Sequence, residues 1–133
     1  MDIFELADLA GQQQRSGRRY LEFLRVPSLT SGIYVLPAGA TDTQQPHSED
    51  EVYYVVRGRA RVQVDNEDRP VEPGSLVFVK ATVPHRFHSI TEELTLLVFF
   101  APAEGTTWQF NFEWAPSLCC TRGGDPASGT QLR

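Results

Sequence analysis

The chain has 133 residues, of which 41% are hydrophobic and 22% are charged, and its formal net charge is −5. This length and composition are typical of one folded domain with its own core. The acidic balance argues against a nucleic-acid partner, because acidic surface repels phosphate. We also expect no membrane partner and no secretory signal, since the sequence contains neither an apolar run of roughly 18 residues nor a basic, then apolar N-terminus.

The pattern of apolar residues changes after residue 19. Residues 1–19 show only a loose helical spacing of apolar side chains, and we expect a short helix or turn that leads into the domain. From residue 20 on, short runs rich in Val, Tyr and Phe are separated by turn residues, which predicts strands. The predicted strands are Tyr20–Val26, Gly32–Leu36, Glu51–Val56, Ala60–Val64, Ser75–Val79, His85–Ile90 and Leu94–Ala101. Many short strands without helices between them indicate an all-β antiparallel sandwich or barrel.

The C-terminal part contains one more strand pattern and then a change of composition. Trp108–Trp114 alternates strictly between aromatic and polar residues, which predicts a strand that covers an apolar surface of its own barrel or of a neighbouring subunit. We therefore expect one domain over 20–116 and a flexible tail over 117–133. Cys119 and Cys120 are adjacent and cannot form the framework of a disulfide-rich scaffold, which favours a cytoplasmic location.

The candidate chemistry lies around three histidines, His47, His85 and His88. Positions two apart in an extended chain face the same way, so Gln45, His47 and, after a short turn, Glu51 can project into one space. Glu51 opens an apolar strand, where a carboxylate is costly to bury without a cation or a donor. With His85 it completes a set of two histidines and one carboxylate, which suits a divalent metal and leaves positions for substrate. His88 has the wrong parity relative to His85 and is interpreted as structural.

The spacing of these residues resembles the two sequence motifs of the cupin superfamily. The first motif is G-x5-H-x-H-x3-E-x6-G, and every spacing fits here, with a glutamine in place of the first histidine. Its positions are occupied by Gly39, Gln45, His47, Glu51 and Gly58. The second motif, G-x5-P-x-G-x2-H-x3-N, matches in residue type only at its glycine and its histidine. Its positions are occupied by Gly74, Lys80, Thr82, His85 and Ser89.

The resemblance covers roughly residues 20–103 and implies a fold and a site. The implied fold is a cupin β-barrel, a jelly-roll-like double-stranded β-helix of two antiparallel sheets, preceded here by the short N-terminal helix or turn. The implied site holds one divalent transition-metal ion, Fe, Mn, Ni, Cu or Zn, with His47, Glu51 and His85 as ligands. Gln45 either completes a set of four ligands or hydrogen-bonds to a metal-bound water.

Four neighbours of these residues are interpreted from strand parity and position. Tyr53 and Phe87 share parity with Glu51 and His85 and are candidates to line the pocket, with core packing as the alternative. Glu49 and Asp50 lie in the turn before the strand and are interpreted as solvated acids.

Two functions follow from this site. The first is a small-molecule metalloenzyme, of dioxygenase type with a redox metal or an isomerase or lyase with a Lewis-acid metal. The second is a non-catalytic module that binds a small ligand or acts as a sensor; a structural dimer with a relic site is a third hypothesis. If Glu51 is a ligand, the sequence offers no obvious separate general base. We also expect a homodimer, because small cupins commonly form one and because the strand that begins at Glu51 is apolar on both faces.

Overall fold

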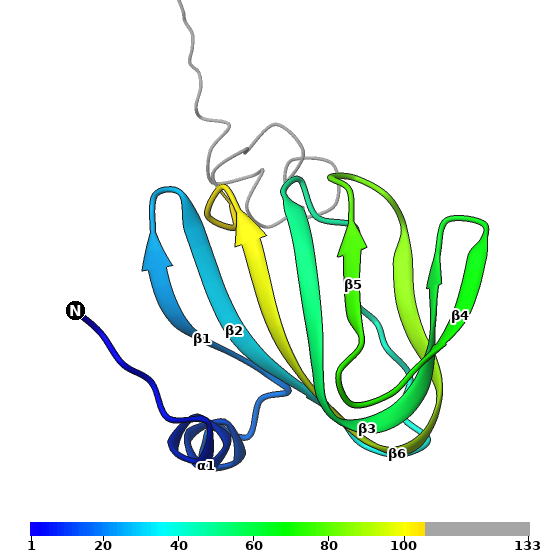
Figure 1. Cartoon of the computed structure of the whole chain (residues 1–133), viewed down its shortest axis with the longest axis horizontal. Coiled ribbons are helices and arrows are strands. Elements are labelled where there is room, and N and C mark those ends of the chain that lie inside the picture. The colour runs from blue at the N-terminus through cyan, green and yellow to red at the C-terminus, as the bar shows by residue number, and fades with distance from the viewer. Residues whose placement is uncertain (106–133) are drawn as a thin grey trace, which may run out of the picture.

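A computed structural model describes residues 1–105 of the chain (Figure 1). The predicted strand at Trp108–Trp114, the tail at 117–133 and the two cysteines lie outside the described residues. A single helix precedes the strands in chain order. The described elements are α1 (Leu6–Ser16), β1 (Tyr20–Val26), β2 (Leu29–Leu36), β3 (Asp50–Val64), β4 (Glu67–Val71), β5 (Leu76–Val79) and β6 (His85–Ala101).

The described strands form one antiparallel sheet with the order β1-β2-β6-β3-β4, and β5 also pairs with β3. β3 and β6 are long, at 15 and 17 residues. The first part of β3 pairs with β5 and its last part pairs with β4. Both long strands curve strongly, so that the end of the sheet containing β4 turns away from the end containing β1 (Figure 1). The all-β antiparallel prediction is confirmed, and the two predicted sheets are two parts of one bent sheet.

The sequence predicted two gaps between strands that are absent in the structure, so the strand boundaries predicted at these gaps were wrong. β3 continues through the predicted turn at Arg57 and Gly58, and β6 joins the two strands predicted at either side of residues 91–93. The pairing of β3 with β6 shifts register between Val55 and Arg61, which marks bulges. Gly58 has a φ of +100°, and a Cβ there would lie 2.2 Å from the carbonyl oxygen of Glu93. Glycine therefore lets the strand bend here without ending.

Two elements at the edges of the sheet complete the fold. β4 was not predicted, because Glu67–Val71 is polar and contains Pro70; it lies at an edge, where a proline need not interrupt the ladder. The predicted N-terminal helix is confirmed as α1, which buries Leu9 and ends at Gly17 in the left-handed conformation. No helix within residues 1–105 is long and apolar enough to cross a membrane.

The alternation of side chains along the strands creates an apolar interior with polar residues at one end. Tyr53, Leu94 and Leu96 are fully buried in this core. Glu51 and His85 are also buried, at 2% and 8% exposure, although both are polar. The outer face of β5 is the opposite case, because Leu76 and Phe78 are 70% and 61% exposed. The buried polar pair is the feature of the fold that points to a site.

Candidate metal centre

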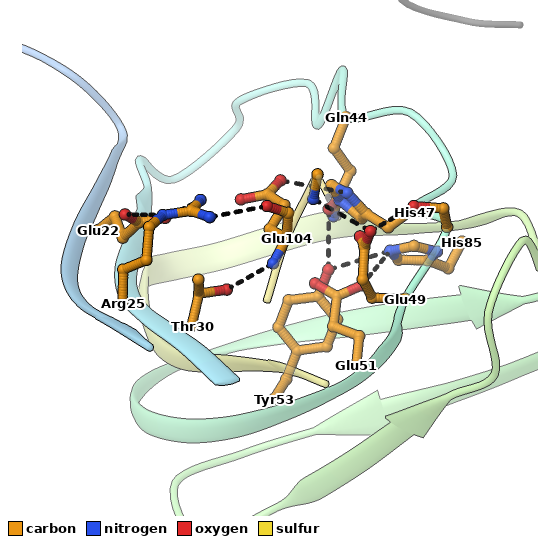
Figure 2. A network of polar contacts seen from close by, with 12 residues as sticks. Glu22, Arg25, Thr30, Gln44, His47, Glu49, Glu51, Tyr53, His85 and Glu104 are labelled. Atoms are coloured by element: carbon orange, nitrogen blue, oxygen red, sulfur yellow. Dashed lines mark hydrogen bonds and ion pairs between the residues drawn. The ribbon is translucent and has the colours of Figure 1, made fainter. Parts of the chain in front are cut away.

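The three residues predicted as metal ligands converge at one point inside the barrel. Each offers a ligand atom, and the atoms of His47, Glu51 and His85 all lie within 4.8 Å of one another. Glu51 stands near the start of β3, where it pairs with Val79 of β5 and with Phe100 of β6. His85 opens β6, and His47 comes from the loop before β3. The ladder therefore fixes two of the three side chains, and Figure 2 shows all three directed at one another.

The imidazole of His85 is held on both sides, by a hydrogen bond at Nδ1 and by an ion-pair contact at Nε2. Its Nδ1 lies 2.9 Å from the carbonyl oxygen of Val83, so the Nδ1 proton is directed there and Nε2 faces the cluster. Nε2 lies 3.1 Å from Oε1 of Glu51. Burial by itself lowers the pKa of His85. The Glu51 carboxylate, the bond to the Val83 carbonyl and the charge of Asp42 together raise this pKa above its usual value. Apart from the contact with His85, the buried carboxylate oxygens of Glu51 accept no hydrogen bond within residues 1–105.

His47 is positioned by its backbone and by a ring contact. Its carbonyl oxygen accepts a hydrogen bond of 2.7 Å from the backbone N–H of Thr82, and its ring meets Phe100 edge-on at 4.6 Å. Its Nδ1 lies 3.5 Å from a carboxylate oxygen of Glu104. Burial lowers the pKa of His47, which favours the neutral imidazole, the form that binds metal ions.

The glutamine in this site is Gln44, one residue before the predicted position. Gln45 is exposed, whereas Gln44 lines the cavity beside the cluster. Nε2 of Gln44 donates to Asp42 at 2.7 Å, and the hydroxyl of Tyr53 donates to Oε1 of Gln44 at 2.8 Å. Buried Asp42 also accepts a hydrogen bond from the Tyr34 hydroxyl at 2.7 Å. These bonds hold the loop so that the side chain of Gln44 points inward. The expectation that Gln45 and His47 face the same way holds only in an extended strand, and this segment is a loop.

The two aromatic pocket candidates occupy different places. The Tyr53 hydroxyl lies 3.0 Å from Nε2 of His85, and Tyr53 lines the cavity. Phe87 packs behind it in the core, with ring centroids 4.9 Å apart and the planes nearly perpendicular. His88 lies outside the cluster, with Nε2 at 2.9 Å from Asp68, in agreement with its structural interpretation.

The interpretation of Glu49 as a solvated acid was wrong, because its side chain is buried. Ser48 Oγ donates to the Glu49 carboxylate, and the backbone N–H of Gly105 donates to it at 3.0 Å. The segment after β6 therefore folds back over the start of β3, a contact between distant parts of the chain. Asp50 is exposed, as predicted, and accepts a hydrogen bond from the backbone of Ala81.

A cavity of about 210 Å³ lies against the cluster. Most of its lining is apolar or aromatic, and it consists of Tyr20, Tyr34, Gln44, His47, Glu51, Tyr53, Val98, Phe100 and Glu104. Glu104 was missed in the sequence, because it follows β6 outside both motifs and no spacing marks it. Burial, and then the charge of Glu49, raise the pKa of Glu104 to about 7. The site therefore contains a second carboxyl group that exchanges protons near neutral pH.

Comparisons with known proteins identify the family and agree with the fold. Residues 32–101 match the model of the family Cupin_2, described as a cupin domain. An uncharacterized protein of Streptomyces coelicolor, SCO3923, is 46% identical over 104 residues, which cover 78% of this chain and 99% of that protein. The crystal structure of TT1209 from Thermus thermophilus is 27% identical, with a TM-score of 0.61, over 77% of this chain and 98% of that one.

A more distant structure agrees in fold. An RmlC-like cupin from Methanocaldococcus jannaschii, which has a double-stranded β-helix fold, is 16% identical with a TM-score of 0.58. The match covers 63% of this chain and 79% of that one.

Proposed function

Because this chain belongs to the cupin domain family, we propose that it is a small-molecule metalloenzyme. In this proposal one divalent transition-metal ion, Fe, Mn, Ni, Cu or Zn, is held by His47, Glu51 and His85. The observation that carries the proposal is the convergence of the three ligand atoms within 4.8 Å of one another, deep in the barrel.

The chemistry of these residues fits such an ion. Two imidazoles and one carboxylate are ligands that first-row transition metals accept. A buried carboxylate with few donors is costly unless a cation is near, and Glu51 is such a carboxylate. The lowered pKa of His47 favours an imidazole with a free lone pair, and the Nδ1 bond of His85 turns its Nε2 toward the cluster.

The residues around the ligands have separate roles in positioning groups and in proton transfer. A redox-active ion would supply oxygen chemistry here, and a redox-silent ion would polarise a carbonyl group. Tyr53 and Gln44 hold each other through their hydrogen bond and so keep a fixed polar edge beside His85. Glu104 can take up or release a proton at its carboxyl group near neutral pH, which supplies the acid or base that the sequence did not reveal.

Metal content tests the proposal. Untagged full-length protein, loaded with metal and desalted, is expected to retain about one equivalent of a transition metal per chain by plasma mass spectrometry. His47→Ala is expected to lose the metal, whereas His88→Ala serves as the matched control, because His88 lies outside the cluster. A wild-type protein that retains no metal would contradict the proposal and favour a metal-free ligand-binding module.

A further inference from the structure

The cavity beside the metal centre combines aromatic rings with carboxylates. Its lining includes four aromatic side chains and two carboxylates, from Tyr20, Tyr34, Tyr53, Phe100, Glu51 and Glu104. The face of an aromatic ring attracts a cation through the quadrupole of the ring. No lysine or arginine among residues 1–105 lines this cavity, so an anionic ligand would find no side-chain cation there.

Arg25 reaches the same region but is directed elsewhere. Its guanidinium pairs with Glu22 at 2.9 Å. Its other terminal nitrogen donates to the backbone carbonyl of Glu104 at 3.1 Å and not to the Glu104 carboxylate (Figure 2). Arg25 therefore fixes the backbone that carries Glu104 and leaves the carboxyl group facing the cavity.

Two carboxylates line the cavity, those of Glu51 and Glu104. In the proposed metal centre Glu51 faces the ion, which leaves Glu104 as the lining carboxyl group outside the ligand set. No lysine or arginine among residues 1–105 lines the cavity beside Glu104. The ionised form of Glu104 would attract a positively charged ligand and repel a negatively charged one.

The position of Tyr20 is a second, independent sign of a ligand. Its ring lies over Gly32, where a Cβ would come within 2.3 Å of the ring, and it meets Tyr34 edge-on at 6.1 Å. Its hydroxyl is buried and has no hydrogen-bond partner within residues 1–105. A buried hydroxyl without a partner costs free energy, and a ligand in the cavity can provide the missing partner.

The volume of the cavity gives a scale for the part of the ligand that lies inside it. A water molecule takes about 30 Å³ of the liquid. At that volume per non-hydrogen atom, a cavity of about 210 Å³ holds roughly seven such atoms.

We propose that the ligand of this cavity is a small organic cation, an alkylammonium or similar onium ion of about seven non-hydrogen atoms. Its charged head lies among the aromatic rings and beside Glu104. This inference rests on the proposed function, because the cavity is the one beside the metal centre, but it concerns the class of substrate and not the ion.

Three probes of nearly equal shape test the charge of the ligand. They are choline, the neutral alcohol in which a tert-butyl group replaces the trimethylammonium group, and the tert-butylacetate anion. Calorimetric titration of the full chain, with and without loaded metal, is expected to show choline binding at least about tenfold more tightly than the alcohol. The anion is expected to bind most weakly. Choline that binds no more tightly than the alcohol, or an anion that binds most tightly, overturns the inference.

Variants separate charge from packing. Glu104→Gln is expected to lower the affinity for choline several-fold and to leave the affinity for the alcohol unchanged; Glu67→Gln, at an exposed carboxylate, is the control. Tyr20→Leu is expected to weaken choline binding more than Tyr20→Phe, because the phenylalanine keeps the ring and loses only the hydroxyl. Thermal melting verifies that each variant is folded. If Glu104→Gln binds choline as the wild type does, Glu104 is not the partner of the cation and the inference is wrong.

The two proposals fail in different ways. A protein that retains metal but shows no preference for choline over the alcohol contradicts the inference and leaves the metal centre intact. A protein that retains no metal but prefers choline contradicts the metal centre and supports the class of ligand.

Discussion

The carboxyl group of Glu104 is expected to make the protein less stable as the pH rises. Burial, followed by the charge of Glu49, raises the pKa of Glu104 from 4.5 to about 7. A group whose pKa is higher in the folded state binds its proton more tightly there. Its stabilising contribution is therefore complete below about pH 4.5 and is lost as the pH rises through about 7.

The size of this effect follows from the two pKa values. Their difference corresponds to roughly 3 kcal/mol, at about 1.4 kcal/mol for each pH unit between them. The side chain retains 30% exposure, so solvent screens part of the effect. We expect about 1–2 kcal/mol after this correction.

Glu104→Gln isolates the ionisation, because the amide resembles the protonated acid and cannot lose a proton. In urea denaturation of chelator-treated protein, the variant is expected to be more stable than the wild type by about 1–2 kcal/mol above about pH 8. Below about pH 4.5 the two proteins are expected to be equally stable. Glu67→Gln, at an exposed position, is expected to show no such pH dependence. A gain that is the same at every pH, or no gain, refutes this reasoning.

Three further outcomes are expected. Gly58→Ala should destabilise the fold by about 2 kcal/mol or more in urea denaturation, and Gly39→Ala by only about 1 kcal/mol. Both glycines have a positive φ, but only at Gly58 would a Cβ clash with the backbone, at Glu93. Equal losses of stability in the two variants would contradict this. Tyr53→Phe should cost about 1 kcal/mol through the lost hydroxyl bonds, and an unchanged urea midpoint contradicts it. The homodimer that the sequence predicts is expected to bury Leu76 and Phe78, so Leu76→Asp should yield monomers in light scattering; a monomeric wild type contradicts it.

Most of the strands could be predicted from local patterns, but several of their boundaries could not. Tyr20–Val26 was predicted to the residue, because a polar or turn-forming stretch lies on each side of it. The continuity of β3 and β6 depends on pairing between the two strands. This pairing continues, with shifts of register, on both sides of Gly58 and of residues 91–93, although the apolar pattern stops there. β4 was missed for the same reason, since its pairing with β3 holds a polar, proline-containing segment in place.

The three residues of the cluster could be found from fixed spacings, which place Glu51 and His85 on the neighbouring strands β3 and β6 and His47 in the loop just before β3. The rest of the site depends on loops and on contacts between distant residues. Gln44 is turned inward by its bond to Asp42, which spacing does not encode. The burial of Glu49 and the position of Glu104 both result from the segment after β6 folding back over the start of β3. Such contacts appear only once the chain is folded.

The claim that His47, Glu51 and His85 hold a metal ion is tested most directly by locating the ion. Crystals of the metal-loaded protein, measured at the absorption edge of the retained metal, would show its position by anomalous scattering. We expect one peak per chain among the three side chains, at about 2.0–2.3 Å from their ligand atoms. An ion bound elsewhere, or a loaded crystal with no peak and with His85 still paired to Glu51, would contradict the account.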